Sequence, residues 1–405
     1  MRLNPIFKDN MVLQRSKPVR ISGTAGIVPP SGNVTARIKD GETVLSSGLT
    51  SSFNEDGAFT LIIPELAAGG PYTLEVTCGT EQISLKNVFA GEVWIAGGQS
   101  NMEYPLGRSE GAETAVSSCP ETNIHFYHVP VTDDPSDGTD TKWDVIDRDT
   151  CYDMSGVAFY FARNLGKSLA DVHIGIIGCY LGGTSVSSWQ SAEALNTTPE
   201  GRRYIDDHKT ECGKWKNEQE YTAAELQYKE QAGQYEDKVR RVLADDPYKT
   251  YADTDKITGA GPWPPPVTPV SIRRPGALYE GMVAPLAPFS VRGVIFYQGE
   301  EDTGSRSGDY AALFGSLIRD WRSAFGDPDM PFLFCGLPEF PLSANGGRED
   351  PGWQELRDQQ RLVADTIPNS YMADLTGCGE TDNVHPSDKK TPGGRLADLA
   401  LRFVY

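Results

Sequence analysis

Residues 93–102 combine a strand, a tight turn and a serine in an arrangement that suits nucleophilic chemistry. The apolar run at 93–96 predicts a buried strand, and the two glycines after it permit a sharp turn. Ser100 then begins a predicted helix, at the carboxyl edge of a sheet, where α/β proteins place their ligands. The segment does not match the G-x-S-x-G elbow. The alternative is that Ser100 merely caps the helix, since serine is a preferred N-cap residue.

Two further segments at predicted strand ends carry hydrogen-bond donors. Gly182 and Gly183 follow the strand predicted at 173–177, and glycines let backbone N–H groups approach a ligand closely. Gln298 follows the strand predicted at 293–297 and can present two amide hydrogens. The plainer alternatives are a strand-to-helix turn at the glycines and a solvated acidic loop after Gln298.

A fourth segment supplies a candidate base. His385 lies in a loop after the strand predicted at 371–375, and Asp382 precedes it by three residues. A carboxylate at this spacing can reach one ring nitrogen across a turn, fix the tautomer and stabilise the imidazolium. None of the other four histidines has such an acid in a strand-end loop. With 56 acidic residues a chance pair is easy to find, so a structural role is the alternative.

Together these segments predict the parts of an acyl-transfer site. Ser100 would be the nucleophile, His385 the base that takes its proton, and Asp382 the residue that orients His385. The predicted oxyanion donors are the Ser100 N–H, the Gly182 or Gly183 N–H and the Gln298 amide. Because each donor contributes about 3–4 kcal/mol to the barrier, loss of Gln298 should slow the reaction by orders of magnitude while sparing the fold.

The elements that must position these residues fall into two parts. Residues 1–88 show short alternating strands separated by turn signals, which predicts a small N-terminal β-sandwich domain. From residue 89 strands alternate with helices, which is typical of an α/β domain with a parallel sheet covered on both faces. Its predicted strands are 93–96, 173–177, 293–297, 331–335 and 371–375.

Helical patterns lie between these strands. One helix should begin after a cap at Ser155, another spans about 310–321, and a last one runs from Lys389 to Tyr405. A polar insertion at about 190–275 carries a stripe of apolar residues at helical spacing, which predicts a helix packed on the main domain. The proline-rich loop 261–266 follows this stripe and either walls a cleft or merely connects elements.

Composition excludes several classes of protein. The 405 residues contain 39% hydrophobic and 23% charged residues, which is ordinary for a globular protein. The net charge of -19 argues against nucleic acid or an anionic membrane as partner, and no apolar run is long enough to span a bilayer. Seven scattered cysteines without a C-x-x-C pair exclude a zinc ribbon. The first residues lack a signal peptide, so we expect a cytoplasmic protein, or an exported one if a leader has been removed.

With these motifs in order, the chain resembles the sialate O-acetylesterase family of SGNH (GDSL-like) hydrolases. The resemblance is carried by 10–15 (NMVLQR), 93–103 (VWIAGGQSNME), 182–189 (GGTSVSSW), 297–300 (YQGE), and by the closing D-x-x-H-P at 382–386 with Lys389 and 394–397 (GRLA). These segments span most of the chain.

The resemblance implies a flavodoxin-like three-layer α/β/α SGNH hydrolase domain at 89–405, after the β domain at 1–88. It also implies removal of acetyl groups from sugars without a metal or other cofactor, with Ser100, His385 and Asp382 as the triad. Gln298 would take the place of the asparagine of the wider SGNH group. The further residues assigned to oxyanion or substrate binding are Gln99, Asn101 and Glu300.

Two departures from the family pattern bear on the substrate. Phe296 replaces a tryptophan and Asp302 an asparagine in the third motif, and a charge at residue 302 argues against an anionic sialate. Acetylated xylan or another glycan is therefore the alternative substrate. Arg108, Arg273 and Arg274 could meet a carboxylate, although surface placement is the simpler expectation for each.

Two other functions remain as alternatives. One is a metal-dependent hydrolase, because acid-rich loops bind hard cations; its ligands would be Glu300, Glu301, Asp302 and His385. The other is a catalytically inactive carbohydrate-binding protein. The sequence does not determine the oligomeric state.

Overall fold

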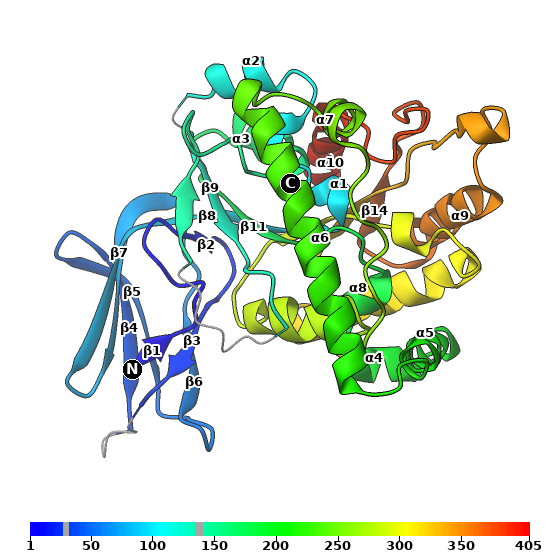
Figure 1. The fold of residues 1–405 in the computed structure, drawn as a ribbon. Helices are drawn as coiled ribbons and strands as arrows, with labels where there is room; N and C mark the ends of the chain where they lie inside the picture. Colours follow the sequence, from blue (N-terminus) through cyan, green and yellow to red (C-terminus); the bar gives the residue numbers. More distant parts are fainter. Residues whose placement is uncertain (27–31, 121, 134–140) are drawn as a thin grey trace.

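The computed structural model describes residues 1–26, 32–120, 122–133 and 141–405 (Figure 1). The N-terminal part is built from strands alone. A three-stranded antiparallel sheet has the order β1–β3–β6, and in a second sheet β4 pairs with β5 and β7. The strands are β1 (Arg2–Leu3), β2 (Val12–Gln14), β3 (Val19–Thr24), β4 (Val34–Asp40), β5 (Thr43–Thr50), β6 (Ala58–Ile63) and β7 (Gly69–Cys78).

One long strand, β8 (Glu81–Gly98), belongs to both parts of the molecule. Its first half pairs antiparallel with β7, and its second half pairs in parallel with the central strands of the large sheet. The register shifts near Asn87, whose φ is 53°, so the strand bends there as a bulge does. The boundary expected between residues 88 and 89 lies inside this strand.

The large sheet places β8 at its centre. The order β10–β9–β11–β8–β12–β13–β14 is parallel throughout except for the antiparallel edge strand β10. After β8 the chain first forms the strands on one side of it, β9 to β11, and then those on the other side, β12 to β14. The carboxyl end of β8 is therefore a topological switch point, which is the usual ligand position in such folds. The strands are β9 (Ile124–His128), β10 (Trp143–Val145), β11 (Ile174–Tyr180), β12 (Gly293–Tyr297), β13 (Phe332–Cys335) and β14 (Ser370–Ala373).

The five strands expected from the sequence in this region are all present, and the ends of four of them are shifted by at most a few residues. The strand expected at 93–96 is the last part of β8, which begins much earlier, at Glu81. Two strands were not expected. β9 contains two histidines within five residues, and β10 has only three residues, so neither gives an apolar run. The predicted α/β class is confirmed as a mixed fold with a large sheet and helices.

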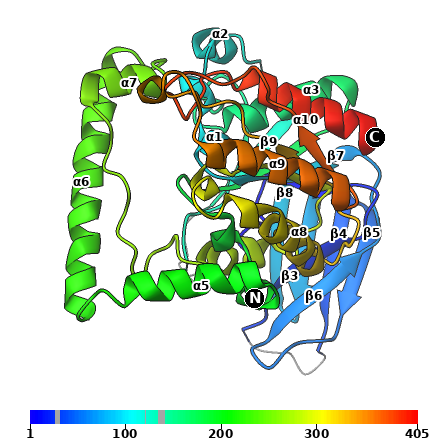
Figure 2. The same cartoon turned by 90° about the vertical axis from the view of Figure 1, so that its right-hand side faces the viewer.

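Helices cover both faces of this sheet (Figure 2). Trp94 packs against Phe161 of α3 (Gly156–Ser168) and donates to Tyr405, which follows α10 (Lys390–Phe403). Gly97 faces Trp321 of α8 (Tyr310–Phe325), which packs beside α9 (Pro351–Thr366). Residues 94 and 97 point to opposite faces of a strand, so the two helix pairs lie on opposite sides. The expected cap of α3 is confirmed, because the Ser155 side chain accepts from the Ala158 N–H.

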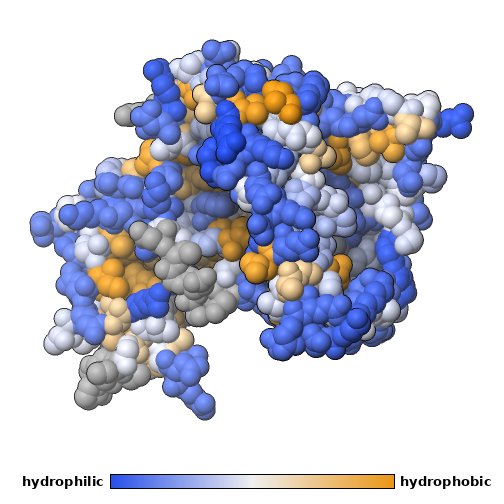
Figure 3. Space-filling model, in the orientation of Figure 1, coloured by the Kyte–Doolittle hydropathy of each residue, from blue (hydrophilic) through white to orange (hydrophobic). Residues whose placement is uncertain are grey.

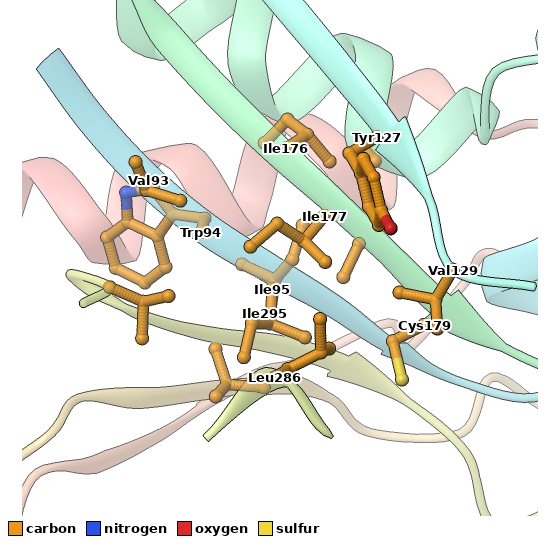
Figure 4. Packing of buried hydrophobic residues seen from close by; sticks show 14 of the residues in the cluster. Val93, Trp94, Ile95, Tyr127, Val129, Ile176, Ile177, Cys179, Leu286 and Ile295 are labelled. Carbon is orange, nitrogen blue, oxygen red and sulfur yellow. The ribbon is translucent and has the colours of Figure 1, made fainter. Parts of the chain in front are cut away.

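The interior of the sheet is apolar on both faces. Val93, Ile95, Ile176, Ile177 and Ile295 from the three central strands are all buried and lie together in Figure 4. A parallel sheet covered on both faces requires continuous apolar runs of this kind. The same burial holds the three strand ends in one fixed arrangement.

The insertion consists of α4 (Ala192–Thr197), α5 (Pro199–Cys212), α6 (Glu218–Asp245) and α7 (Tyr251–Thr258). Figure 2 shows α6 along one side of the molecule, with α5 and α7 leading back to the main body at its ends. None of the 28 residues of α6, all of which the structure describes, is buried. The stripe expected to pack on the main domain is only half-buried. Short helices α1 (Ser100–Glu103) and α2 (Ala112–Ser117) follow β8.

In the part of the chain that the structure describes, no helix combines the length and apolarity that crossing a membrane requires.

A buried carboxylate ties the N-terminal segment to the large sheet. Glu92 of β8 is fully buried and forms ion pairs with Arg15 at 2.5 Å and Arg292 at 2.8 Å. Gln14 donates to the same carboxylate at 3.1 Å. Burial acts to raise the pKa of Glu92, but the hydrogen bonds and charges of Arg292 and Arg15 outweigh it and hold the pKa below its usual value.

Replacing this carboxylate tests its role as an anchor. We expect Glu92→Gln to lower the free energy of unfolding by about 3–5 kcal/mol, because it leaves two guanidinium groups without their anion. Urea unfolding followed by circular dichroism measures the change. The control is Lys142→Met, which removes the exposed pair with Asp144 and should leave stability unchanged. Equal midpoints for the two variants would contradict the anchoring role.

Candidate active site

Ser100 is positioned by a turn that only glycine permits. Gly98 has a φ of 131°, and a Cβ on it would lie 2.0 Å from the Tyr297 carbonyl oxygen of the neighbouring strand β12. The Gln99 N–H donates to this same oxygen at 2.9 Å, and α1 then begins at Ser100. The N-cap position belongs to Gln99, so Ser100 is the first helical residue and not the cap. Its hydroxyl is therefore free for another partner.

That partner is the imidazole of His385. Nε2 of His385 lies 2.8 Å from Oγ of Ser100, although the residues are 285 positions apart. The Tyr251 ring packs edge-on against the imidazole, with centroids 5.7 Å apart. Burial first, and the positive charge of Lys389 second, lower the pKa of His385 to about 4. The ring is therefore neutral near pH 7 and can accept the serine proton.

Asp382 does not pair with His385 in the structure. Its carboxylate accepts from the Ser343 N–H at 2.7 Å, and its own N–H donates to the Pro341 carbonyl. Its φ of 56° is in the left-handed region, and its side chain is exposed. Among the described residues, Nδ1 of His385 has no hydrogen-bond partner. The hydrogen bond expected between Asp382 and His385 is thus not formed, because this carboxylate holds the 341–343 segment instead.

A buried polar chain lies behind the Ser100–His385 pair. Nζ of Lys389 donates to the Asn101 amide oxygen at 2.6 Å, and the Asn101 amide nitrogen donates to Glu300 at 2.5 Å and to the Val384 carbonyl at 3.0 Å. Asn101 thereby ties the serine helix to the loop that carries His385. Asn101 and Glu300, expected to bind substrate, are largely enclosed in the protein and act here as connectors.

Burial shifts the pKa values of the ionisable groups in this hydrogen-bonded chain. It lowers the pKa of Lys389 to about 7 and raises the pKa of Glu300. The second carboxyl oxygen of Glu300 is buried without a hydrogen-bond partner among the described residues. The Lys389 ammonium lies 4.4 Å from the centre of the Tyr104 ring, which adds a cation–π contact.

Asp302 organises the loops that follow β11 and β12. Its buried carboxylate accepts from the Ser185 hydroxyl at 2.7 Å, the Val186 N–H at 2.9 Å and the Tyr204 hydroxyl at 2.9 Å. The Gln298 amide donates to it at 2.6 Å. With these four donors Asp302 is a structural group. The sequence-based argument that it places a charge in the cleft against an anionic substrate is not supported.

The predicted oxyanion donors differ in availability. The Gln298 amide nitrogen also lies 3.0 Å from the Thr184 carbonyl and 3.2 Å from the Gln99 side-chain oxygen, so both of its hydrogens have acceptors. The Gly182 N–H donates to the Glu103 carboxylate at 2.7 Å. Among the described residues, the N–H groups of Ser100 and Gly183 have no acceptor. Gln99 holds the Glu301 N–H at 3.3 Å and acts as a bridge.

The three arginines considered as carboxylate partners have different roles. Arg108 donates to the Lys249 and Thr250 carbonyls and stacks on Tyr251, so it anchors the start of α7. Arg274 pairs with Asp133 at 2.8 Å. Arg273 donates to the Gly182 carbonyl at 3.1 Å and, among the described residues, forms no ion pair. Only Arg273 lies at the strand-end loops.

Several residues of the site were not assigned a role from the sequence. Glu103 lies three positions after Ser100, a spacing that places both on one helix face and could have been noticed. Lys389 belongs to the closing motif of the resemblance but received no role from it, and Tyr251 carried no signal. Trp263 lies over Gly183, because a Cβ on that glycine would meet the indole at 1.9 Å. An aromatic residue between prolines was its one sequence signal.

Two of the three acidic residues considered as metal ligands, Glu300 and Asp302, are engaged elsewhere. Glu300 bonds to Asn101, and Asp302 bonds to groups on the loops after β11 and β12. In residues 1–26, 32–120, 122–133 and 141–405, no three histidine, cysteine or acidic side chains gather in a way that could hold a metal ion.

The chain is similar to known carbohydrate esterases. The family model "carbohydrate esterase, sialic acid-specific acetylesterase" matches residues 268–402. Sialate O-acetylesterase of Rattus norvegicus is 25% identical over 422 residues, covering 96% of this chain and 71% of the rat protein. The Homo sapiens sialate O-acetylesterase is 22% identical over 433 residues, covering 100% of this chain and 71% of its own. A solved carbohydrate acetylesterase from Xanthomonas citri matches with a TM-score of 0.71 and 25% identity, covering 98% and 74% of the two chains.

These similarities identify a carboxylic ester hydrolase. The resemblance to the sialate O-acetylesterase family, predicted from the motifs, is confirmed over nearly the whole chain.

The ionisation of His385 can be measured directly. We expect its imidazole to titrate near pH 4, because burial and the Lys389 charge both disfavour the protonated ring. Lys389→Met removes the nearby positive charge and should move the titration to higher pH. Imidazole nitrogen NMR measures both values, with His385→Gln used to assign the signal. A wild-type pKa near 6.5, unchanged in Lys389→Met, would contradict the described environment.

Proposed function

We propose that this chain is a serine esterase that removes O-acetyl groups from carbohydrates. The observation that carries the proposal is the 2.8 Å contact between Ser100 Oγ and His385 Nε2 at the carboxyl edge of the sheet. A neutral, buried imidazole within hydrogen-bond distance of a serine is the arrangement that activates a hydroxyl for attack on an ester.

The proposed reaction begins with attack of Ser100 Oγ on the acetyl carbonyl carbon while His385 takes the hydroxyl proton. The tetrahedral intermediate then collapses, the bond to the sugar oxygen breaks, and His385 returns the proton to that oxygen. The products of this half are the sugar alcohol and acetyl-Ser100. A water molecule deprotonated by His385 then releases acetate and restores the serine.

The N–H groups of Ser100 and of Gly182 or Gly183 are the proposed donors to the oxyanion. Each such donor contributes about 3–4 kcal/mol to lowering the barrier. For Gly182 to act, the oxyanion must replace the Glu103 carboxylate on its N–H. The predicted donor role of Gln298 would require its amide to leave Thr184 and Asp302, so in this proposal Gln298 chiefly holds these loops together.

The finer description of the fold belongs to the same proposal. Strands β1–β7 with the first half of β8 would form the N-terminal β-sandwich, and residues 89–405 would form an SGNH-type hydrolase unit with its insertion at about 190–275. The parallel strands have the order β9–β11–β8–β12–β13–β14, in which β11–β8–β12–β13–β14 supports a flavodoxin-like arrangement and β9 is an additional strand beside β11.

The relatives are sialate and carbohydrate acetylesterases by name, which supports an acetylated sugar as substrate. O-acetyl sialate and acetylated xylan-type sugars are the two candidates. Specificity constants for O-acetylated sialates, acetylated xylo-oligosaccharides and simple acetates would decide between them.

Removing the nucleophile tests the mechanism. We expect Ser100→Ala to reduce kcat on an aryl acetate by at least about a thousandfold and to abolish labelling by a fluorophosphonate, because no other group would form the acyl-enzyme. The melting temperature should stay nearly unchanged. The control is Ser118→Ala, whose hydroxyl bonds, within the described part of the chain, only to the Thr114 carbonyl and whose loss should leave activity intact. Labelling that persists in Ser100→Ala would refute the assignment.

The role of Asp382 is tested separately. We expect Asp382→Asn to keep kcat within about tenfold of the wild type, because the amide oxygen can still accept from Ser343. Asp388→Asn, three residues after His385, is the matched control and should behave like the wild type. A loss of about 10⁴-fold, the size seen when a triad carboxylate is neutralised, would instead place Asp382 on the imidazole during turnover.

A further inference from the structure

An exposed tryptophan lies next to the proposed reacting centre. A Cβ on Gly182 would be 3.3 Å from the Ser100 Cβ, so this glycine touches the serine. Its neighbour Gly183 lies under Trp263, with the six-membered ring of the indole directly against the backbone. The side chain of Trp263 is nevertheless 54% exposed. A large aromatic surface therefore faces solvent one residue away from the backbone that touches Ser100.

The insertion holds this tryptophan in place. The Tyr228 hydroxyl on α6 donates to the Pro262 carbonyl at 3.4 Å, and Glu225 of the same helix accepts from Thr268 at 2.6 Å. Trp215, just before α6, donates to the Val267 carbonyl at 2.8 Å. The half-buried stripe of α6 thus faces residues 261–268, while its outer face is mostly hydrophilic in Figure 3. The prolines around Trp263 restrict the backbone of the segment, because each proline ring fixes φ.

The helix α6 is long compared with the segment 261–268 that it holds. Because none of the residues of α6 is buried, the helix adds little to the main core. Its inner contacts are instead with α7, where the Tyr235 hydroxyl donates to Asp255 at 2.6 Å, and with the proline-rich segment, which returns to the strand-end loops beside Gly183. We infer that the insertion serves to present Trp263 at this place.

A small hollow lies beside the indole. Its volume is about 150 Å³, below the 300–1,000 Å³ of pockets that enclose a drug-sized ligand, so it suits one ring. It is lined by Gly183, His208, residues 263–267, Ser271, Arg273, Arg274 and Glu301. Arg274 is paired with Asp133 at 2.8 Å, which leaves Arg273 as the N–H donor. Burial raises the pKa of Glu301 to about 7, so near neutral pH its carboxyl group can accept and donate hydrogen bonds, which suits the hydroxyls of a neutral ring.

We propose that Trp263 and this hollow form a sugar subsite, which binds a neutral pyranose ring of the acetylated carbohydrate. The ring would stack on the indole, and its hydroxyls would bond to Arg273 and Glu301. Aromatic side chains bind an apolar ring face at low entropic cost, and tryptophan is often a dominant contact. This inference rests on the proposed function, because the ligand is the sugar part of the ester that Ser100 would cleave.

Binding can be measured without turnover, in a Ser100→Ala background, with acetylated xylotriose as the probe. We expect Trp263→Ala to raise the Kd by about tenfold, which corresponds to about 1.4 kcal/mol. Trp263→Leu should lose affinity similarly, and Trp263→Phe should retain most of it, because stacking requires a ring. Leu226→Ala, which removes an exposed apolar side chain from the same insertion, is the matched control and should not change the Kd.

Turnover gives an independent check in enzyme that retains Ser100. Trp263→Ala should lower kcat/KM by about tenfold more with acetylated xylotriose than with ethyl acetate, which has no ring. Equal losses on both substrates would overturn the subsite and make Trp263 a support for the Gly183 backbone.

Three other outcomes would also overturn the subsite. They are an unchanged Kd in Trp263→Ala, no binding of acetylated xylotriose, and binding of an O-acetyl sialate that depends on Arg273 but not on Trp263. Failure of the proposed function would instead appear as hydrolysis that persists in Ser100→Ala, while the Trp263 binding results would stand.

Discussion

The proposed chemistry of this structure depends on the hydrogen bond between Ser100 and His385. It joins residues 285 positions apart, and neither side chain can do acyl-transfer chemistry alone. The parallel sheet brings them together, because Ser100 follows β8 at the switch point and His385 lies in the loop that follows β14. The apolar packing of β8, β11 and β12 is thus what fixes the geometry of a polar pair.

A second layer of buried polar groups keeps that pair aligned. Asn101 receives a hydrogen bond from Lys389 and donates to Glu300 and to the Val384 carbonyl, so one side chain connects the serine helix, the third motif and the histidine loop. Asp302 in turn connects the loops after β11 and β12 through its buried carboxylate. Buried ionisable groups are costly unless they are bonded, so the site is held by groups whose loss would leave partners unsatisfied.

The sequence predicted the parts of the site that depend on local patterns. The apolar runs located the five central strands, and the double glycine with Ser100 located the turn after β8, because strand burial and glycine geometry are local properties. The Asp382 contact could not be predicted in this way, since Asp382 and His385 are close in sequence but the side chain turns toward Ser343 of another loop. The positions of Lys389 and Trp263 depend on tertiary packing, and no short-range spacing encodes it.

The long strand β8 has a consequence for how this chain can change in length. Between Val88 and Gly98 successive side chains alternate between the two faces of the sheet, so gaining or losing one residue would invert every face after it and displace the serine. Insertions and deletions among natural homologues should therefore collect in surface loops and spare this stretch. Through β8, the N-terminal strands, which contribute none of the reacting groups, thus fix the position of the serine in the large sheet.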